Sequence, residues 1–385
     1  CQVVFALYKN ALKIIISALL AGMFMSLTAY ADIGNISAAS AILVEQGSMR
    51  VLLEKSAHEK MSMASTTKIM TTILLIESGD LNRQLTITNE MLAGVDGSSV
   101  GFRAGNVVTC ADLAYGMMLA SGNDAANAAA IYMAGSLEKF SDMMNEKAAQ
   151  IGMTDTHFVT PSGLDADEHY STAYDMALLA SYAMDNPVFA EIAATTVHLI
   201  TCGDPAQTVY FSNHNRLLKT YEGAKGIKTG FTKKSGRCLV SCAERDGVKL
   251  IAVTLKAPDD WNDHEALFDY GFSILKPHEF KTELPITSIS VAGGTPDNIS
   301  IEAQPATLAL LDGDEGKITS SVYLPKFVYA PVTQGDTIGR VDYYLDGRLT
   351  GSAPIVASQD SAGEAASEKS IIEKMIYWFY MLLCW

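Results

Sequence analysis

Short, mainly apolar, strand-like runs occur at two separated places before residue 276. Each place has two such runs around a turn, which is typical of a β-hairpin. The first turn contains Gly47, and the second contains Asp246-Gly247, a pair that favours tight hairpin turns. The strands expected from this pattern are residues 41–44, 49–53, 237–243 and 248–255.

Between the two hairpins, apolar residues recur at the spacing of amphipathic helices. Ala173, Met176, Ala177 and Ala180, for example, fall on one helical face. Helices are expected at residues 65–76, 112–119, 124–133, 137–151, 172–184 and 265–275. With strands at both ends and helices between them, the order predicts an α+β domain. The terminal strands are expected to pair in one antiparallel sheet that carries helices on its faces.

Helical periodicity disappears after Pro277. Short β-rich runs punctuated by Gly, Pro, Asp and Asn follow, and Asp346-Gly347 is a further hairpin signal. We therefore expect a small all-β domain over residues 278–357. It has no cluster of histidine, cysteine or paired acids, so a supporting or interaction role is favoured for it. The expected strands lie within residues 286–291, 299–303, 307–311, 322–329, 337–344 and 348–354.

The N-terminal stretch has the pattern of a secretory signal peptide. Lys9 and Lys13 precede an apolar run, and Ala29-Tyr30-Ala31 has the small-x-small form of a cleavage site. A short transmembrane anchor is the alternative, but the apolar run is shorter than the ~20 residues that a span needs. We expect residues 1–31 to be removed and the protein to be exported, with the main domain covering residues 32–277.

The C-terminal stretch is apolar on one side and more polar on the other. Residues 358–367 are rich in Ser, Ala and Glu and are expected to be a linker. Residues 368–385 then place apolar side chains at helical spacing, with Trp378 and Trp385 as aromatic anchors. This segment suits an amphipathic helix in a membrane interface, on the outer face of the cytoplasmic membrane. A helix that docks on the β domain is the alternative.

Composition excludes some classes of function. The chain of 385 residues has 43 acidic and 28 basic side chains and a net charge of −15, which argues against a nucleic-acid binder. The cysteines are not spaced as a disulfide framework, so buried free thiols are expected. His157, His169 and His214 lie far apart without a partner motif. We therefore expect structural histidines, no metal and no cofactor.

Ser65 and Lys68 are the first candidates for chemistry. A helix turns once in about 3.6 residues, so side chains three apart share a face. A serine hydroxyl needs a neighbouring base to act as a nucleophile, and a buried lysine can be that base if its pKa is lowered. Alone, the Ser-x-x-Lys spacing is weak, because a helix-capping serine followed by a solvated lysine has the same pattern.

Two more short motifs follow in order, Ser121-Gly122-Asn123 and Lys228-Thr229-Gly230. With Ser65-x-x-Lys68 they form the motif set of penicillin-binding proteins and class A β-lactamases. The chain resembles the D-alanyl-D-alanine carboxypeptidases of the low-molecular-mass penicillin-binding proteins. The resemblance runs from about Ala38 to Leu275, and further stretches support it: residues 161–164, 170–177, 213–218 and 226–232.

The resemblance implies a β-lactamase/transpeptidase-like domain and a role for each motif. Ser65 is expected to attack the carbonyl of the penultimate D-alanine of a peptidoglycan stem peptide, with Lys68 as the proton acceptor. Ser121 relays a proton to the leaving amine. Substrate is held by the following residues: Asn123, Lys228, Thr229, Gly230 and Phe231, whose N–H forms the oxyanion hole with that of Ser65. β-Lactams are the expected inhibitors.

Two features of the sequence qualify the resemblance. Thr160 stands where the family often has Asn before the Pro-x-Gly-Leu run, which puts fine substrate detail in question. Gly97-Ser98-Ser99-Val100-Gly101 matches the nucleophile elbow of α/β-hydrolases, but it lacks the preceding strand and following helix that the elbow needs. Ser99 is therefore discounted as a nucleophile.

Three other functions remain open from sequence. A β-lactamase shares the acylation residues, but Glu168 and Glu191 lack the Glu-x-x-x-Asn setting of its deacylating base. A D,D-endopeptidase acting on crosslinked peptides would use the same residues. A non-catalytic peptidoglycan-binding protein would have no need for the complete set of reactive side chains.

Overall fold

The computed structural model describes residues 35–203 and 206–363. The expected signal peptide and the expected C-terminal helix, residues 368–385, lie outside these ranges. Within them, no helix is long and apolar enough to cross a membrane. The cysteines at 110, 202, 238 and 242 are free, and all except Cys202 are buried.

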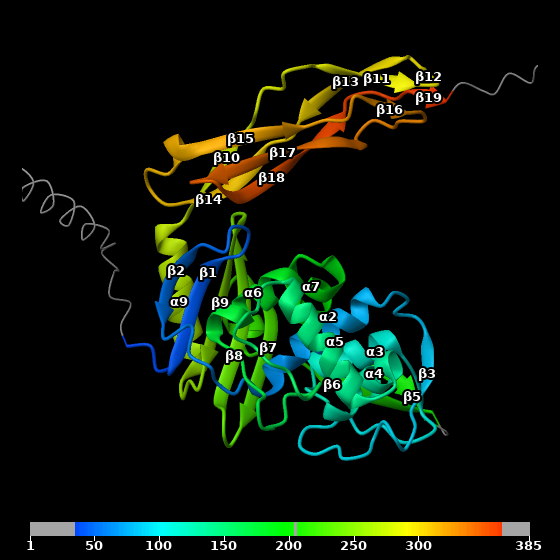
Figure 1. The fold of residues 1–385 in the computed structure, drawn as a ribbon, viewed down its shortest axis with the longest axis vertical. Helices are drawn as coiled ribbons and strands as arrows, with labels where there is room; N and C mark the ends of the chain where they lie inside the picture. The colour runs from blue at the N-terminus through cyan, green and yellow to red at the C-terminus, as the bar shows by residue number, and fades with distance from the viewer. Residues whose placement is uncertain (1–34, 204–205, 364–385) are drawn as a thin grey trace, which may run out of the picture. The chain divides into compact units, whose positions relative to one another are not determined.

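A five-stranded antiparallel sheet forms the centre of the first domain (Figure 1). The first strands of the domain pair with the last, and Leu43 lies opposite Ala252. This confirms the α+β fold and the pairing of terminal strands that the sequence predicts. The strand order is β2 (Val51–Lys55), β1 (Ser40–Glu45), β9 (Val248–Leu255), β8 (Gly236–Arg245) and β7 (Ala224–Thr232).

Helices cover both faces of this sheet because its strands are apolar on both sides. Ile42 belongs to the large core shared with the helices of the domain, whereas the next residue, Leu43, points the other way. Leu43 meets α9 (Asp260–Ile274) at Gly271, where an added Cβ would lie 3.0 Å from the Leu43 side chain. The large core contains residues of α2 (Lys68–Glu77), α3 (Cys110–Met118), α4 (Asn123–Ala134), α5 (Leu137–Gln150), α6 (Ala173–Met184) and α7 (Pro187–Ala194).

Side-chain caps explain where several helices begin. Thr109 and Asp112 form a reciprocal capping box at the start of α3. Thr172 caps α6, and Asn186 caps α7 with Pro187 in its first turn. The domain also contains five shorter elements: β3 (Gln84–Thr86), β4 (Val107–Thr109), β5 (Val197–Cys202) and β6 (Gln207–Ser212), which form a hairpin, and α8 (Leu217–Thr220).

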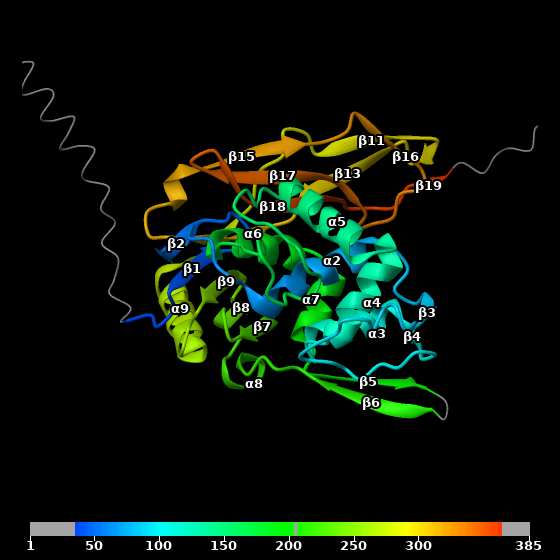
Figure 2. The ribbon, with the colours of Figure 1, turned by 60° about the horizontal axis from the view of Figure 1, so that its bottom comes forward.

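The second domain is all β, as the sequence predicts (Figure 2). Its six-stranded sheet has the order β15 (Ile318–Tyr323), β17 (Thr337–Leu345), β18 (Arg348–Ala357), β13 (Asn298–Ala303), β11 (Ser288–Ala292) and β16 (Phe327–Tyr329). Ile289, Val291 and Ile355 lie in its core. Two further pairs are β10 (Lys276–Phe280) with β14 (Ala306–Leu310), and β12 (Gly294–Thr295) with β19 (Ala362–Gly363); η2 (Glu315–Lys317) is a short turn.

The β structure extends beyond the expected boundaries at both ends. β10 begins at Lys276, before the expected start at residue 278. Ser361 is fully buried and its hydroxyl donates to the Pro296 carbonyl at 2.6 Å. Residues 358–363, expected to belong to a linker, are therefore part of this domain.

Candidate active site

Ser65 lies in a short 3-10 turn, η1 (Ala64–Thr67), that leads directly into α2. The Lys68 Nζ lies within hydrogen-bonding distance of the Ser65 Oγ, at 3.0 Å. The preceding residue, Ala64, has a φ of 48°, a backbone conformation that costs energy for a residue with a Cβ. Its carbonyl accepts from the Thr67 hydroxyl at 2.8 Å. An added Cβ at Gly163 would lie 1.9 Å from this carbonyl oxygen, so only glycine fits there.

Lys68 is fully buried and bonded on three sides. Besides Ser65, its Nζ donates to the Asn123 Oδ1 at 2.7 Å and to the Ser162 carbonyl at 2.6 Å. Burial, and then the positive charge of Lys228, hold the pKa of Lys68 well below its usual value, whereas the Asp124 carboxylate opposes this shift. A neutral amine has two N–H groups; when these donate to the Asn123 and Ser162 oxygens, the nitrogen lone pair is left to accept the Ser65 proton across 3.0 Å.

Lys228 is also buried, on strand β7. Burial lowers its pKa to about 7. Its Nζ donates to the Thr229 carbonyl at 2.9 Å. Because a carboxylate beside it would restore the charged form, Lys228 is suited to binding an anionic group.

Ser121-Gly122-Asn123 forms the connection between α3 and α4. Ser121 has a φ of 59°, a second strained residue close to Ser65. An added Cβ at Gly122 would lie 2.7 Å from the Val100 side chain, which explains the glycine. The Asn123 Nδ2 donates to the Asp96 carbonyl at 2.5 Å, so its Oδ1 is oriented towards Lys68.

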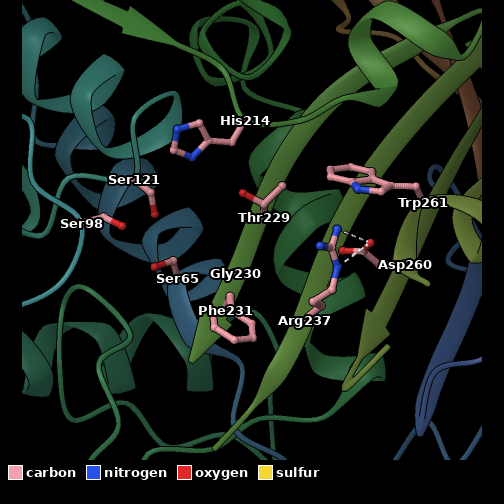
Figure 3. A pocket seen from close by; sticks show the side chains of 10 residues that line it. All are labelled: Ser65, Ser98, Ser121, His214, Thr229, Gly230, Phe231, Arg237, Asp260 and Trp261. Carbon is pink, nitrogen blue, oxygen red and sulfur yellow. Dashed lines mark hydrogen bonds and ion pairs between the residues drawn. The ribbon is translucent and has the colours of Figure 1, made fainter. Parts of the chain in front are cut away.

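These motifs meet at a cavity of about 470 Å³. Figure 3 shows Ser65 and Ser121 on one side of it and Thr229, Gly230 and Phe231 along strand β7. The strand backbone passes close to the Ser65 turn, because an added Cβ at Gly230 would lie 3.0 Å from the Ser65 nitrogen. Lys68, Asn123 and Lys228 do not line the cavity, and the three side chains are buried behind its wall.

Other residues line the cavity that sequence reasoning did not select. Arg237 donates to the Asp260 carboxylate at 2.6 Å, and its guanidinium lies 5.6 Å from the centre of the Trp261 ring. His214, expected to be structural, also lines the cavity, and burial and Lys228 lower its pKa. The remaining lining residue is Ser98. Of these residues, His214 is the one that the sequence could have pointed to, since residues 213–218 form one of the stretches that resemble the carboxypeptidase family.

His169 holds the Ser65 turn from behind. Its Nδ1 accepts from the Val159 N–H at 2.9 Å, so its Nε2 carries the proton and donates to the Thr67 hydroxyl at 3.0 Å. Burial lowers its pKa to about 4, which keeps the ring neutral. Thr160 also keeps a structural role, because its hydroxyl donates to the Leu164 carbonyl and accepts from the Gly163 N–H.

Ser99 faces Asp124 rather than the cavity. Its hydroxyl donates to the Asp124 carboxylate at 2.6 Å, and the N–H groups of Val100, Gly101 and Phe102 donate to the same carboxylate. The residues around Ser99 form no strand and no helix. The Gly-x-Ser-x-Gly match is thus a loop anchored on Asp124.

Replacing Ser99 by alanine is expected to leave the rate of acylation by penicillin within about twofold of the wild-type rate. The change removes one hydrogen bond to a carboxylate, which costs roughly 1.5–3 kcal/mol of stability. Labelling with a fluorescent penicillin measures the rate, and thermal unfolding measures the stability. Loss of acylation in a folded variant would give Ser99 a chemical role.

Comparison with known proteins defines the class. Residues 26–259 match the sequence profile of the peptidase family S11, described as D-alanyl-D-alanine carboxypeptidase, and residues 276–362 match the C-terminal domain of penicillin-binding protein 5. The chain belongs to this family of serine peptidases, as the resemblance of its motifs predicts.

Individual relatives match over most of their length. The chain is 30% identical to the D-alanyl-D-alanine carboxypeptidase DacF of Bacillus subtilis over 84% of this chain and 85% of the relative. It is 32% identical to DacC of Escherichia coli over 85% of this chain and 84% of the relative. The structure of penicillin-binding protein 5 from Haemophilus influenzae superposes with a TM-score of 0.63 at 26% identity, over 86% of this chain and 98% of that one.

Proposed function

We propose that this protein is a serine-type D-Ala-D-Ala carboxypeptidase. It removes the terminal D-alanine from peptidoglycan stem pentapeptides through an acyl-enzyme on Ser65, and penicillin acylates the same residue. The observation that carries the proposal is the contact between the Ser65 Oγ and the Nζ of the fully buried Lys68, at 3.0 Å. The names of the relatives supply the substrate class.

In the acylation step, Lys68 accepts the Ser65 proton while the Oγ attacks the carbonyl of the penultimate D-alanine. The backbone N–H groups of Ser65 and Phe231 stabilise the oxyanion that develops. The peptide bond then breaks, and the leaving amine of D-alanine takes a proton through Ser121. Water attacks the ester in the second step, which releases the shortened peptide and returns the proton to Ser65.

Substrate binding follows from the other motifs. Thr229, which lines the cavity, receives the terminal carboxylate, and the buried Lys228 beside it in the strand supplies the positive charge that selects a free C-terminus. Asn123 lies next to Lys68 and can bond the amide of the substrate once the side chains adjust. Gly230 lets the substrate backbone run close beside strand β7, since it has no Cβ to obstruct the approach.

The burial of two lysines argues against a function in binding alone. Lys68 and Lys228 are each at most 1% exposed. Burying an ammonium group lowers the stability of the fold, and a protein that only binds peptidoglycan gains nothing in return. The β-lactamase alternative needs a base for fast deacylation. Neither Glu168 nor Glu191 lines the cavity, which favours a long-lived penicillin adduct.

Release of D-alanine from diacyl-Lys-D-Ala-D-Ala tests the proposed reaction. We expect steady release by the wild-type protein and slow loss of bound penicillin. Rapid penicillin turnover without release of D-alanine would instead identify a β-lactamase. Absence of both reactions in the folded protein would leave the binding function.

We further propose that the protein is exported and attached to the outer face of the cytoplasmic membrane through residues 368–385. The support for this attachment is the apolar spacing of that segment and its aromatic anchors. It does not depend on the cavity, so it can fail independently of the proposed reaction.

Ending the chain after Gly363 is expected to move the protein from the membrane fraction to the soluble fraction. This end point keeps β19 and the buried Ser361, so the β domain remains intact. Sedimentation of membranes with the full-length and shortened chains measures the distribution. If the shortened chain still sediments with membranes, residues 368–385 are not the anchor.

A further inference from the structure

One end of the β domain carries exposed aromatic side chains on an uncharged face. Phe327 and Tyr329 lie on the edge strand β16 and are 46% and 73% exposed. Residues two apart on a strand point to the same side, so the two rings share a face. Their ring centres are 5.2 Å apart, in an edge-to-face arrangement.

The neighbouring strand extends this face without adding charge. β11 pairs with β16 in parallel, and Phe327 lies opposite Ser290 while Tyr329 lies opposite Ala292. Ile289 and Val291 alternate with these residues and point into the core. The exposed residues of the two strands are Ser288, Ser290, Ala292, Phe327 and Tyr329. These five residues carry no charge; exposed Lys326 precedes β16, and exposed Glu302 lies on β13, two residues after Ser300, which pairs with Ser288.

The chain leaves the described part of the β domain beside this face. Gly363 pairs with Gly294, two residues after Ala292 in sequence. Ser361 pairs with Val332, and the Ala330 N–H donates to the Ala292 carbonyl at 3.1 Å. Figure 1 places β11, β12, β16 and β19 together, and Figure 2 places β11, β16 and β19 together. The apolar segment 368–385 therefore begins only a few residues after Gly363, which lies at the same end of the β domain as Tyr329.

We propose that this face, formed by Ser288, Ser290, Ala292, Phe327 and Tyr329, is a second contact with the lipid bilayer surface. Aromatic side chains favour the membrane–water interface, where the ring meets the acyl region and a polar tip stays hydrated. An uncharged face avoids the cost of desolvating ions there. One amphipathic segment alone fixes a point of attachment, whereas a second contact fixes which side of the β domain faces the bilayer.

The proposal rests on the proposed membrane attachment and not on the proposed reaction. It is tested with the full-length chain and vesicles of phosphatidylcholine, whose lack of net charge makes binding report apolar contact. The double variant Phe327→Ser/Tyr329→Ser is expected to bind the vesicles about tenfold more weakly than the wild type, since two exposed rings no longer insert. Release of D-alanine from a soluble peptide is expected to stay unchanged.

Tyr323→Ser is the matched control. Tyr323 is 44% exposed on β15, at the opposite edge of the same sheet, and Arg340 lies 4.6 Å from its ring centre. We expect vesicle binding by this variant to match that of the wild type. A second pair adds charge instead of removing rings: Ser290→Glu is expected to weaken binding, and Ser320→Glu on β15 to leave it unchanged.

Equal vesicle binding by the wild type and the Phe327/Tyr329 double variant would overturn the proposal while leaving attachment through residues 368–385 in place. The proposal would also be overturned if the β15 control variants bound vesicles as weakly as the variants of this face, because the effect would then not be specific to the face. A wild-type protein that releases D-alanine but does not bind vesicles would contradict membrane attachment, and this surface with it.

Discussion

Replacing Lys68 by methionine is expected to slow both acylation by penicillin and release of D-alanine by about a thousandfold or more. The variant keeps the length of the buried side chain and removes the amine that contacts the Ser65 Oγ at 3.0 Å. Methionine is preferred to alanine because a cavity at this fully buried position would itself destabilise the fold. The rate of labelling by penicillin gives the acylation rate directly.

The pH dependence of the wild-type enzyme should agree with this role. Since burial and Lys228 hold the pKa of Lys68 well below its usual value, the neutral amine persists to lower pH than in an ordinary lysine, and the acylation rate is expected to fall as acid protonates it. If folded Lys68→Met retained acylation within about tenfold of the wild-type rate, the base would lie elsewhere, because loss of a general base costs about a hundredfold or more. His214, which lines the cavity, would then be the next candidate.

Replacing Lys228 by methionine is expected to raise the free energy of unfolding and, at the same time, to lower the rate of hydrolysis. The ordinary pKa of 10.5 is lowered to about 7 by burial in the folded state. Such a shift corresponds to roughly 4–5 kcal/mol of destabilisation at pH values below about 7. Methionine removes this cost but also the bond to the Thr229 carbonyl, so a net gain of roughly 2 kcal/mol is expected. Hydrolysis is expected to fall about a hundredfold, because the substrate carboxylate loses its charged partner.

The sign of the pH effect is fixed by which state binds more protons. Between about pH 7 and the ordinary value of 10.5, the unfolded chain keeps the Lys228 proton and the folded chain does not. Wild-type stability therefore gains from Lys228 as pH rises through this range, and the Lys228→Met variant lacks that gain. Lys68 contributes a dependence of the same sign, so the slope is reduced rather than removed.

Urea unfolding of wild type and variant at several pH values measures this difference. Lys225→Met is a suitable control, because Lys225 lies on the same strand with a partly exposed side chain paired with Glu244. It should change neither the stability nor the hydrolysis appreciably. A less stable Lys228→Met variant would contradict the account of a buried, costly amine.

The sequence predicts four of the five strands of the first sheet, all except β7, because these four are apolar runs joined by turns such as Asp246-Gly247. It does not predict the hairpin of β5 and β6, where exposed Leu199 and Tyr210 stand beside inward-facing Ile200 and Phe211. With apolar residues on both faces, the two-residue period disappears from the sequence. The boundary near residue 358 was missed for a similar reason, since Ser361 is polar yet buried.

The three motifs of the site could be predicted from the sequence, whereas the other residues that line the cavity could not. Ser65 and Lys68 are one helical turn apart, so local geometry brings them together. Arg237 and Asp260 are 23 positions apart and meet only because the start of α9 lies beside the start of β8. Nothing in their spacing indicates a shared cavity. The anchoring of the Ser99 loop on Asp124 likewise depends on tertiary packing.

The most direct test of the central claim is the position of the penicillin adduct. Full-length protein is incubated with penicillin, digested with trypsin and analysed by mass spectrometry, with Ser65→Ala as the matched control. We predict that the wild-type peptide Met61–Lys68 gains the mass of one penicillin on Ser65, and that the Ser65→Ala protein gains no adduct and releases no D-alanine. An adduct on another residue, or D-alanine release by folded Ser65→Ala, would contradict the account.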